Sequence, residues 1–217
     1  SSTSRGLGDV YKRQHEGWPT QWNTFVEFFC RQSREHLRNT FRQWCDSRPP
    51  GNKFAWRKTD KLSGSSPAMR WTNPPVAWMM HAGIQRMLHA GLAFPAHRYP
   101  RKRTHIKRIA LEAYPGFTAR KITRNSYKSD SPAKQTRERQ DRRELILDAL
   151  SAGQAGLAIR FEADRQWRKR IIADARGDFL DAVICSLQAG HAALQRNFGL
   201  PRTLDTLEGW IASVPVR

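Results

Sequence analysis

The sequence predicts a mostly helical chain that carries a single β-strand. In several long segments apolar residues recur every three or four positions, which is the pattern of amphipathic helices. One segment instead alternates apolar and polar residues, as a half-buried strand does. Because a lone strand cannot satisfy its own backbone hydrogen bonds, we expect partner strands that these 217 residues do not supply.

The N-terminal half contains two predicted helices. Residues 20–46 repeat aromatic and aliphatic side chains at helical spacing until a Pro-Pro-Gly sequence ends the pattern. Residues 51–75 are predicted to be irregular and include a basic, aromatic stretch at 53–60. A second helix begins after Pro75, and Gly91 is predicted to cap its end. The side chains expected to face its core are Val76, Met79, Met80, Gly83, Ile84, Met87 and Leu88.

Residues 106–114 form the predicted strand, after a basic loop at 98–108. Ile109, Leu111 and Ala113 fall on one side of it, and the intervening residues fall on the other. The strand ends at Pro115, where another helix is predicted to begin.

The C-terminal half is predicted to contain three helices after a polar connector at 124–137. They cover residues 138–152, 162–175 and 178–194, and the third is apolar on almost every side, which is typical of a buried helix. The tail at 207–211 is expected to dock on the body of the protein. Side chains expected to point inward from the first two helices are Leu145, Ile146, Leu150, Trp167, Ile171 and Ile172.

Residues 1–14 are predicted to lie outside the folded domain, which would then cover residues 15–217. The stretch DVYKRQ at 9–14 resembles the translation of a transposon-end adapter used in sequencing libraries. We therefore expect the natural N-terminal part of the protein to lie upstream of this sequence. A natural polar tail is the alternative.

The composition favours a nucleic-acid partner. The chain has 38 Lys and Arg residues against 19 Asp and Glu, a formal net charge of +19. Clustered positive charge suits a phosphate backbone, although a single cluster is more often a solvated face. The two clusters flank the predicted strand: Arg98, Arg101, Lys102, Arg103, His105, Lys107 and Arg108; and Arg120, Lys121, Arg124, Lys128, Lys134, Arg137, Arg139, Arg142 and Arg143.

A membrane partner is not expected. No apolar run approaches the roughly 20 residues that a membrane-crossing helix needs. The three Cys residues form no disulfide framework, and they predict a reducing, cytoplasmic compartment.

Three carboxylates are candidates for chemistry because acidic residues are scarce in this chain. Glu112 lies at the end of the predicted strand, and Asp178 and Asp181 share one side of a helix start. Carboxylate oxygens are the ligands that Mg²⁺ prefers, and two such ions can promote phosphodiester hydrolysis. The alternative is structural: Asp178 would be an N-cap and Asp181 would complete a capping box.

Six segments in order resemble one family, domain-of-unknown-function family 429, which is described as predicted nucleases of RNase H-like fold. They are 53–60 (KFAWRKTD), 71–79 (WTNPPVAWM), 111–116 (LEAYPG), 126–130 (SYKSD), 177–182 (GDFLDA) and 207–211 (LEGWI). The resemblance implies an α/β fold with a mixed sheet and flanking helices. The N-terminal strands of that fold have no counterpart before His15.

The resemblance also implies site residues. Glu112 matches an acidic residue on the fourth strand of the family, and Asp181, with Asp178, matches the acidic position on the last helix; together they would bind Mg²⁺ or Mn²⁺. The family's first-strand Asp is missing, so we expect this chain alone to be inactive. The leading hypothesis is a metal-dependent nuclease that hydrolyses phosphodiester bonds, and the alternative is a non-catalytic, basic nucleic-acid-binding module. Matching motif positions with expected substrate contact are Arg57, Asp60 and Lys128.

Overall fold

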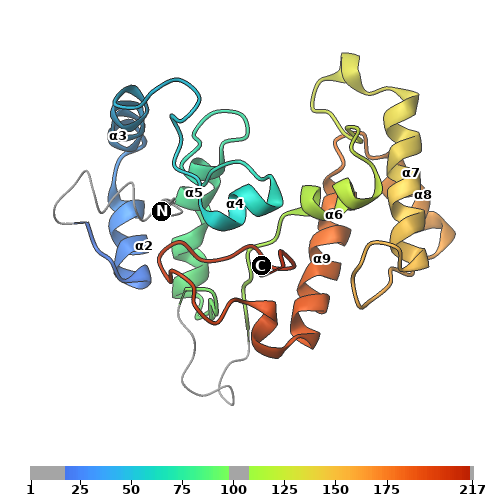
Figure 1. Cartoon of the computed structure of the whole chain (residues 1–217). Coiled ribbons are helices and arrows are strands. Elements are labelled where there is room, and N and C mark those ends of the chain that lie inside the picture. Colours follow the sequence, from blue (N-terminus) through green and yellow to red (C-terminus); the bar gives the residue numbers. More distant parts are fainter. Residues whose placement is uncertain (1–17, 98–107, 216–217) are drawn as a thin grey trace. The chain divides into compact units, whose positions relative to one another are not determined.

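The computed structural model describes residues 18–97 and 108–215, which are mostly helical, as predicted (Figure 1). The chain divides into two compact units. Unit 1 is Ser1–Leu111 with Leu200–Ile211, and unit 2 is Glu112–Gly199 with Ala212–Arg217. The predicted tail at 1–14 and most of the basic loop at 98–108 lie outside the described residues. That residues 15–217 form one domain stays a prediction.

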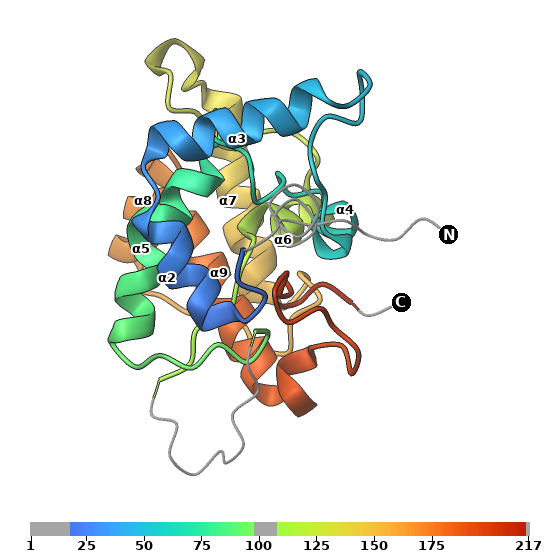
Figure 2. The same ribbon diagram turned by 90° about the vertical axis from the view of Figure 1, so that its left-hand side faces the viewer.

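Unit 1 begins with two helices where the sequence predicted one. The helix expected over residues 20–46 is interrupted, and it forms α2 (Trp22–Arg31) and α3 (Arg34–Asp46). Ser33 has an extended backbone, and its hydroxyl oxygen accepts a 3.1 Å hydrogen bond from the His36 N–H. This N-cap starts a new helix, and α3 crosses the direction of α2 in Figure 2.

An aromatic core holds unit 1 together. α5 (Val76–His89) packs against α2, and the ring of Phe41 from α3 lies 5.8 Å from that of Trp71. The prediction for α5 was wrong at Met79 and Met87, which are exposed, because the buried face is centred on Ala77. Gly91 follows the C-cap Ala90 with a φ of +72°, so the predicted glycine stop is confirmed.

The C-terminal tail docks within unit 1, as predicted. Leu207, Trp210 and Ile211 are buried. The Ile211 N–H donates a 3.0 Å hydrogen bond to the Thr59 hydroxyl of α4 (Lys58–Ser63). The tail is therefore fastened to α4, and its Leu207 joins the hydrophobic core of unit 1.

The predicted strand is wrong for the part of it that the structure describes, residues 108–114. This segment makes an isolated parallel bridge between Ile109 and Ala93. The Ala93 N–H donates to the Arg108 carbonyl (3.0 Å), and the Ala110 N–H donates to the Ala93 carbonyl (2.9 Å). The backbone is extended here, where apolar and polar side chains alternate, but no sheet forms among the described residues. The described part of the chain therefore does not support an RNase H-like sheet.

Unit 2 contains the other helices of the described chain, close to their predicted positions. α6 (Pro115–Ile122) is followed by the short turn η2 (Pro132–Lys134), and α7 (Arg137–Ala152) by α8 (Arg165–Ala173). α9 (Asp178–Leu194) has the predicted bounds and leads into η3 (Arg196–Gly199). The largest fully buried side chains of its core are Ile146, Leu147, Leu150, Leu180 and Ile184.

Two expectations for unit 2 are corrected. Leu145 and Trp167 point outward, because Ile146 and Ile171 occupy the core-facing positions of α7 and α8. α9 is not buried on every side, since Phe179 and Leu194 are exposed. The apolar composition of α9 therefore leaves large side chains on the surface of this unit.

Candidate functional site

A cluster of three polar side chains joins the connector after α6 to the first turn of α9. The Tyr127 hydroxyl donates a 2.6 Å hydrogen bond to Asp181 Oδ1, and the Lys128 ammonium forms an ion pair with Asp181 Oδ2. Tyr127 is buried, whereas Lys128 and Asp181 are half-buried. We call these residues the Asp181 cluster. It brings together two of the predicted site residues, Lys128 and Asp181.

Three arginines of α7 hold the connector in place. Guanidinium groups of Arg142, Arg143 and Arg139 donate to the successive carbonyl oxygens of residues 126, 127 and 128, at 2.9, 2.8 and 2.8 Å. Arg143 is buried and also donates to the Ile172 carbonyl (2.8 Å). This part of the predicted basic cluster therefore positions Tyr127 and Lys128 instead of forming a fully solvated face.

A glycine allows the connector to approach α9 closely. Gly177 precedes the helix with a φ of +75°, and a Cβ there would lie 2.9 Å from Cβ of Lys128. The Ser129 N–H also donates to the Ala175 carbonyl at 3.1 Å. A side chain at position 177 would therefore require the connector or the start of α9 to shift.

The cluster keeps its tyrosine and its nearest cysteine protonated. Burial raises the pKa of the Tyr127 hydroxyl strongly, and the hydrogen bond to Asp181 adds to that effect. Burial, and then the negative charge of Asp181, raise the pKa of the Cys185 thiol one turn further along α9. Tyr127 is thus a hydrogen-bond donor and Cys185 an unreactive thiol at neutral pH.

Asp174, which was not among the predicted capping residues, caps the start of α9. Asp174 Oδ2 accepts a 2.9 Å hydrogen bond from the Phe179 N–H, and Oδ1 accepts one of 3.1 Å from Arg176. Asp178 is not the N-cap: that position is Gly177, and Asp178 is the first helical residue with an exposed side chain. Asp178 and Asp181 do lie in the first turn, where negative charge is favourable.

The three predicted metal ligands are not assembled into a metal site. Glu112 is half-buried, and its backbone carbonyl accepts a 2.7 Å hydrogen bond from Ala212. In the described ranges, no three or more His, Cys, Asp or Glu side chains are grouped to hold a metal ion. Because Tyr127 and Lys128 already engage both Asp181 oxygens, this arrangement does not fit a shared Mg²⁺ ion. Metal binding by Glu112, Asp178 and Asp181 stays a prediction.

Arg57 and Asp60 form a buried ion pair in unit 1. The Asp60 carboxylate accepts hydrogen bonds from the Arg57 guanidinium (2.7 Å), the Arg57 N–H (3.0 Å) and the Ser65 hydroxyl (3.0 Å). Arg57 also donates to the Glu208 carbonyl at 2.9 Å, which fastens the docked tail. Substrate contact by Arg57 and Asp60 stays a prediction, and the contacts seen here are internal.

An exposed patch on unit 2 combines arginine with aromatic rings. The Arg170 guanidinium lies 4.4 Å from the ring centroid of Trp167 and 5.8 Å from that of Phe179. Both rings are nearly half exposed, at 47% and 43%. We call Trp167, Arg170 and Phe179 the α8 patch, and count with it the exposed Lys169, which precedes Arg170 on the same helix. Helical periodicity wrongly predicted Trp167 to point inward; the signal that it points outward is four basic residues among the nine of α8.

Comparison of the chain with protein-family models, with curated proteins and with solved structures finds no match. The resemblance in the six ordered segments therefore stays a prediction. None of the helices in the described ranges combines the length and apolar character needed to cross a membrane.

Proposed function

We propose that this chain binds nucleic acid through the α8 patch, with phosphates held by its basic residues and bases stacked on its rings. The single observation that carries the proposal is the position of Arg170 over two exposed aromatic rings of a strongly basic chain. Positive side chains supply sequence-independent affinity for phosphate, and exposed aromatic faces stack on unpaired bases.

The basic residues in and beside the patch are available for such contacts. Arg165, Lys169 and Arg170 are exposed, and in the part of the chain that the structure describes none of them is paired with a carboxylate. Arg168 differs, because it forms an ion pair with Asp148. These positive charges are therefore not neutralised by a carboxylate of the described residues.

The test is binding of fluorescently labelled single-stranded DNA and RNA, followed by anisotropy at several salt concentrations. Lys169→Glu with Arg170→Glu should weaken binding at least tenfold and reduce the slope of log K against log[salt] by about two. Arg42→Glu with Arg86→Glu is the matched control, because it makes the same change of charge on exposed residues of unit 1. Trp167→Ala should cost about five- to 150-fold if a base stacks there.

Two outcomes would contradict the proposal. Equal weakening by both pairs would show that only the net charge matters and not this patch. A wild-type chain that binds neither strand at low salt would reject nucleic-acid binding altogether.

Metal-dependent cleavage is a second proposal, favoured by the order of the six segments along the chain. It is tested by incubating the same strands with Mg²⁺ or Mn²⁺ and separating the products. Cleavage that Asp181→Asn and Glu112→Gln both abolish would support it. Cleavage that survives both changes would contradict it, and binding without cleavage favours the non-catalytic module.

A further inference from the structure

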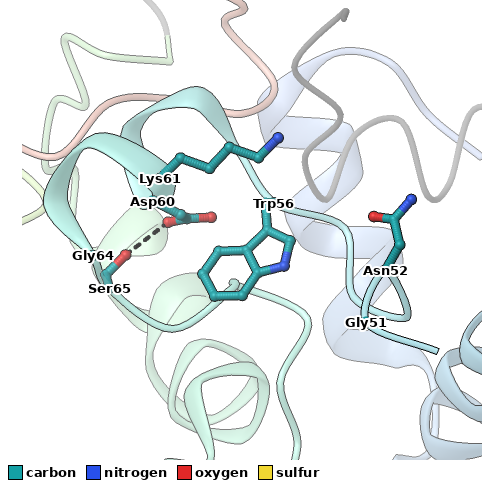
Figure 3. A pocket seen from close by; sticks show the side chains of 7 residues that line it. All are labelled: Gly51, Asn52, Trp56, Asp60, Lys61, Gly64 and Ser65. Carbon is teal, nitrogen blue, oxygen red and sulfur yellow. Dashed lines mark hydrogen bonds between the residues drawn. The ribbon is translucent and has the colours of Figure 1, made fainter.

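Unit 1 contains a hollow of about 390 Å³ that no function has so far explained (Figure 3). It is formed by the segment around α4, between Gly51 and Ser65. Trp56 stands in the middle of it, between Asn52 and Ser65 in this view, with the Lys61 side chain above the ring. The volume lies within the range of small-ligand sites.

Trp56 differs from the other seven tryptophans of the chain. Trp18, Trp22, Trp71 and Trp78 contact other rings, Trp44 lies under Arg48, Trp167 belongs to the α8 patch, and Trp210 is buried. Trp56 is half-buried and is not a member of the core of unit 1. Among the described residues, no ring, cation or hydrogen-bond partner engages its side chain. Its indole face and N–H are thus available to a ligand.

The polar groups around Trp56 select the charge of that ligand. Asn52 and Lys61 are exposed and bring an amide and an ammonium group to the hollow. The one carboxylate in the lining belongs to Asp60, which is buried and already paired with Arg57 and Ser65. Because that negative charge is compensated, the hollow favours an anion.

The frame of the hollow is preformed. Gly64 ends α4 in the left-handed conformation, with a φ of +63°, and the Ser65 N–H donates to the Asp60 carbonyl at 3.1 Å. The ion pair between Arg57 and Asp60 holds the same turn to the docked tail. A ligand would therefore not have to order these residues itself.

We propose that this hollow binds one nucleotide, with its base stacked on Trp56, its base edge near the Asn52 amide and its phosphate near Lys61. A flat aromatic group, a hydrogen-bonding edge and a negative charge occur together in that ligand class. Where the nucleotide is part of a strand, this inference rests on the proposed function. A free nucleotide has the same base and phosphate, so the hollow can be tested without strand binding.

The first experiment uses free ligands and does not depend on strand binding. The Trp56 indole N–H resonance is identified with Trp56→Phe, and the four nucleoside monophosphates are titrated into the wild-type chain. We expect a saturable shift of that resonance with at least one nucleotide, and none with ribose 5-phosphate, which lacks a base. Loss of the shift in Asn52→Ala and Lys61→Gln, but not in the matched controls Asn39→Ala and Lys58→Gln, would place the ligand in the hollow.

The second experiment compares an ordinary single strand with an abasic strand of the same length and phosphate number. Trp56→Ala should remove about five- to 150-fold of the preference for the ordinary strand and leave binding of the abasic strand unchanged. If the variant does not fold, Asn52→Ala supplies the same comparison, because its amide is placed at the edge of the base.

The outcomes separate the two proposals. If no nucleotide or strand moves the Trp56 resonance, the hollow is not a nucleotide site, even when strands still bind through the α8 patch. If free nucleotides move it but strands do not bind, the nucleotide site stands and the proposed function fails.

Discussion

Each unit contains a carboxylate bound by a cation, and the two pairs are built differently. Asp60 is fully buried, and the side chain of its partner Arg57 is 8% exposed. The side chain of Asp181 is 20% exposed, and that of Lys128 is 40% exposed. Asp60 has every oxygen satisfied by unit 1 itself, whereas Lys128 keeps ammonium hydrogens that can reach solvent or a ligand. The same pairing thus stabilises the fold in one unit and leaves a chemically available group in the other.

The comparison also shows why net charge overstates the charge available for binding. Arg139, Arg142 and Arg143 belong to the strongest basic cluster of the sequence, yet they bind backbone carbonyls of the connector. Lys169 and Arg170, in a less conspicuous run, are exposed. A guanidinium that donates to backbone carbonyls is therefore part of the structure, and its removal tests the fold.

The largest effect is expected for Asp60→Asn. Removing this charge leaves the Arg57 guanidinium buried without its counter-ion, which costs about 3–5 kcal/mol of unfolding free energy. Urea denaturation of both proteins would measure it. Arg57→Met combined with Asp60→Leu should recover part of the loss, since no charge is then left unpaired, while the hydrogen bonds of the residue 57 N–H, the Ser65 hydroxyl and the Glu208 carbonyl to this pair are still lost. A loss below about 1 kcal/mol for Asp60→Asn would mean that the pair behaves like a surface pair.

The second effect concerns the α7 arginines that hold the connector in place. Arg143→Met should destabilise the chain by about 2–3 kcal/mol, because the carbonyls of Tyr127 and Ile172 both lose a charged donor. Arg142→Met is the matched control: Arg142 is half-buried, and its guanidinium donates to the Ser126 carbonyl. A control that costs as much as Arg143→Met would show that burial does not distinguish the two positions.

A smaller effect is expected for Asp181→Asn, at about 1 kcal/mol or less. The pair is partly exposed, so solvent screens the charge, and the Tyr127 hydroxyl can still donate to the amide oxygen. Thermal melting without metal measures the change. Stabilisation by Asp181→Asn would instead indicate like-charge repulsion around position 181, as expected if carboxylates there await a metal ion.

The smallest effect is a pH dependence in unit 2. Burial, and then the positive charge of Lys121, lower the pKa of His191, whose Nδ1 accepts a 2.9 Å hydrogen bond from the Ala158 N–H. The folded state therefore prefers neutral imidazole, and this stabilisation is present above the ordinary histidine pKa and is lost as the pH falls.

The melting temperature of the wild-type chain should accordingly fall more between pH 7.5 and 5 than that of His191→Gln. Parallel melting curves in the two buffers would measure the difference. Identical pH profiles would show that His191 does not contribute.

Much of the helical architecture follows from local sequence. The apolar spacing predicts α5, α7, α8 and α9 to within a few residues, Pro115 marks the start of α6, and Gly91 and Gly177 mark helix boundaries. These features depend on neighbours along the chain, such as i, i+4 contacts, fixed proline φ and left-handed glycine. Ser33 is also a residue type that favours an N-cap, but the aromatic repeat continues across it, and the repeat therefore predicted one uninterrupted helix.

The tertiary structure decided what the individual charges and rings do. Spacing placed Asp178 and Asp181 together, but only packing against the connector engaged Asp181 with Lys128 and left Asp178 exposed. Periodicity predicted Trp167 to be a core residue, and only the tertiary packing buried Ile171 and left Trp167 47% exposed. Helix periodicity is set by local geometry, so it can be predicted from the sequence. The partner of a side chain is set by segments far away in the sequence, so only the tertiary structure specifies that partner.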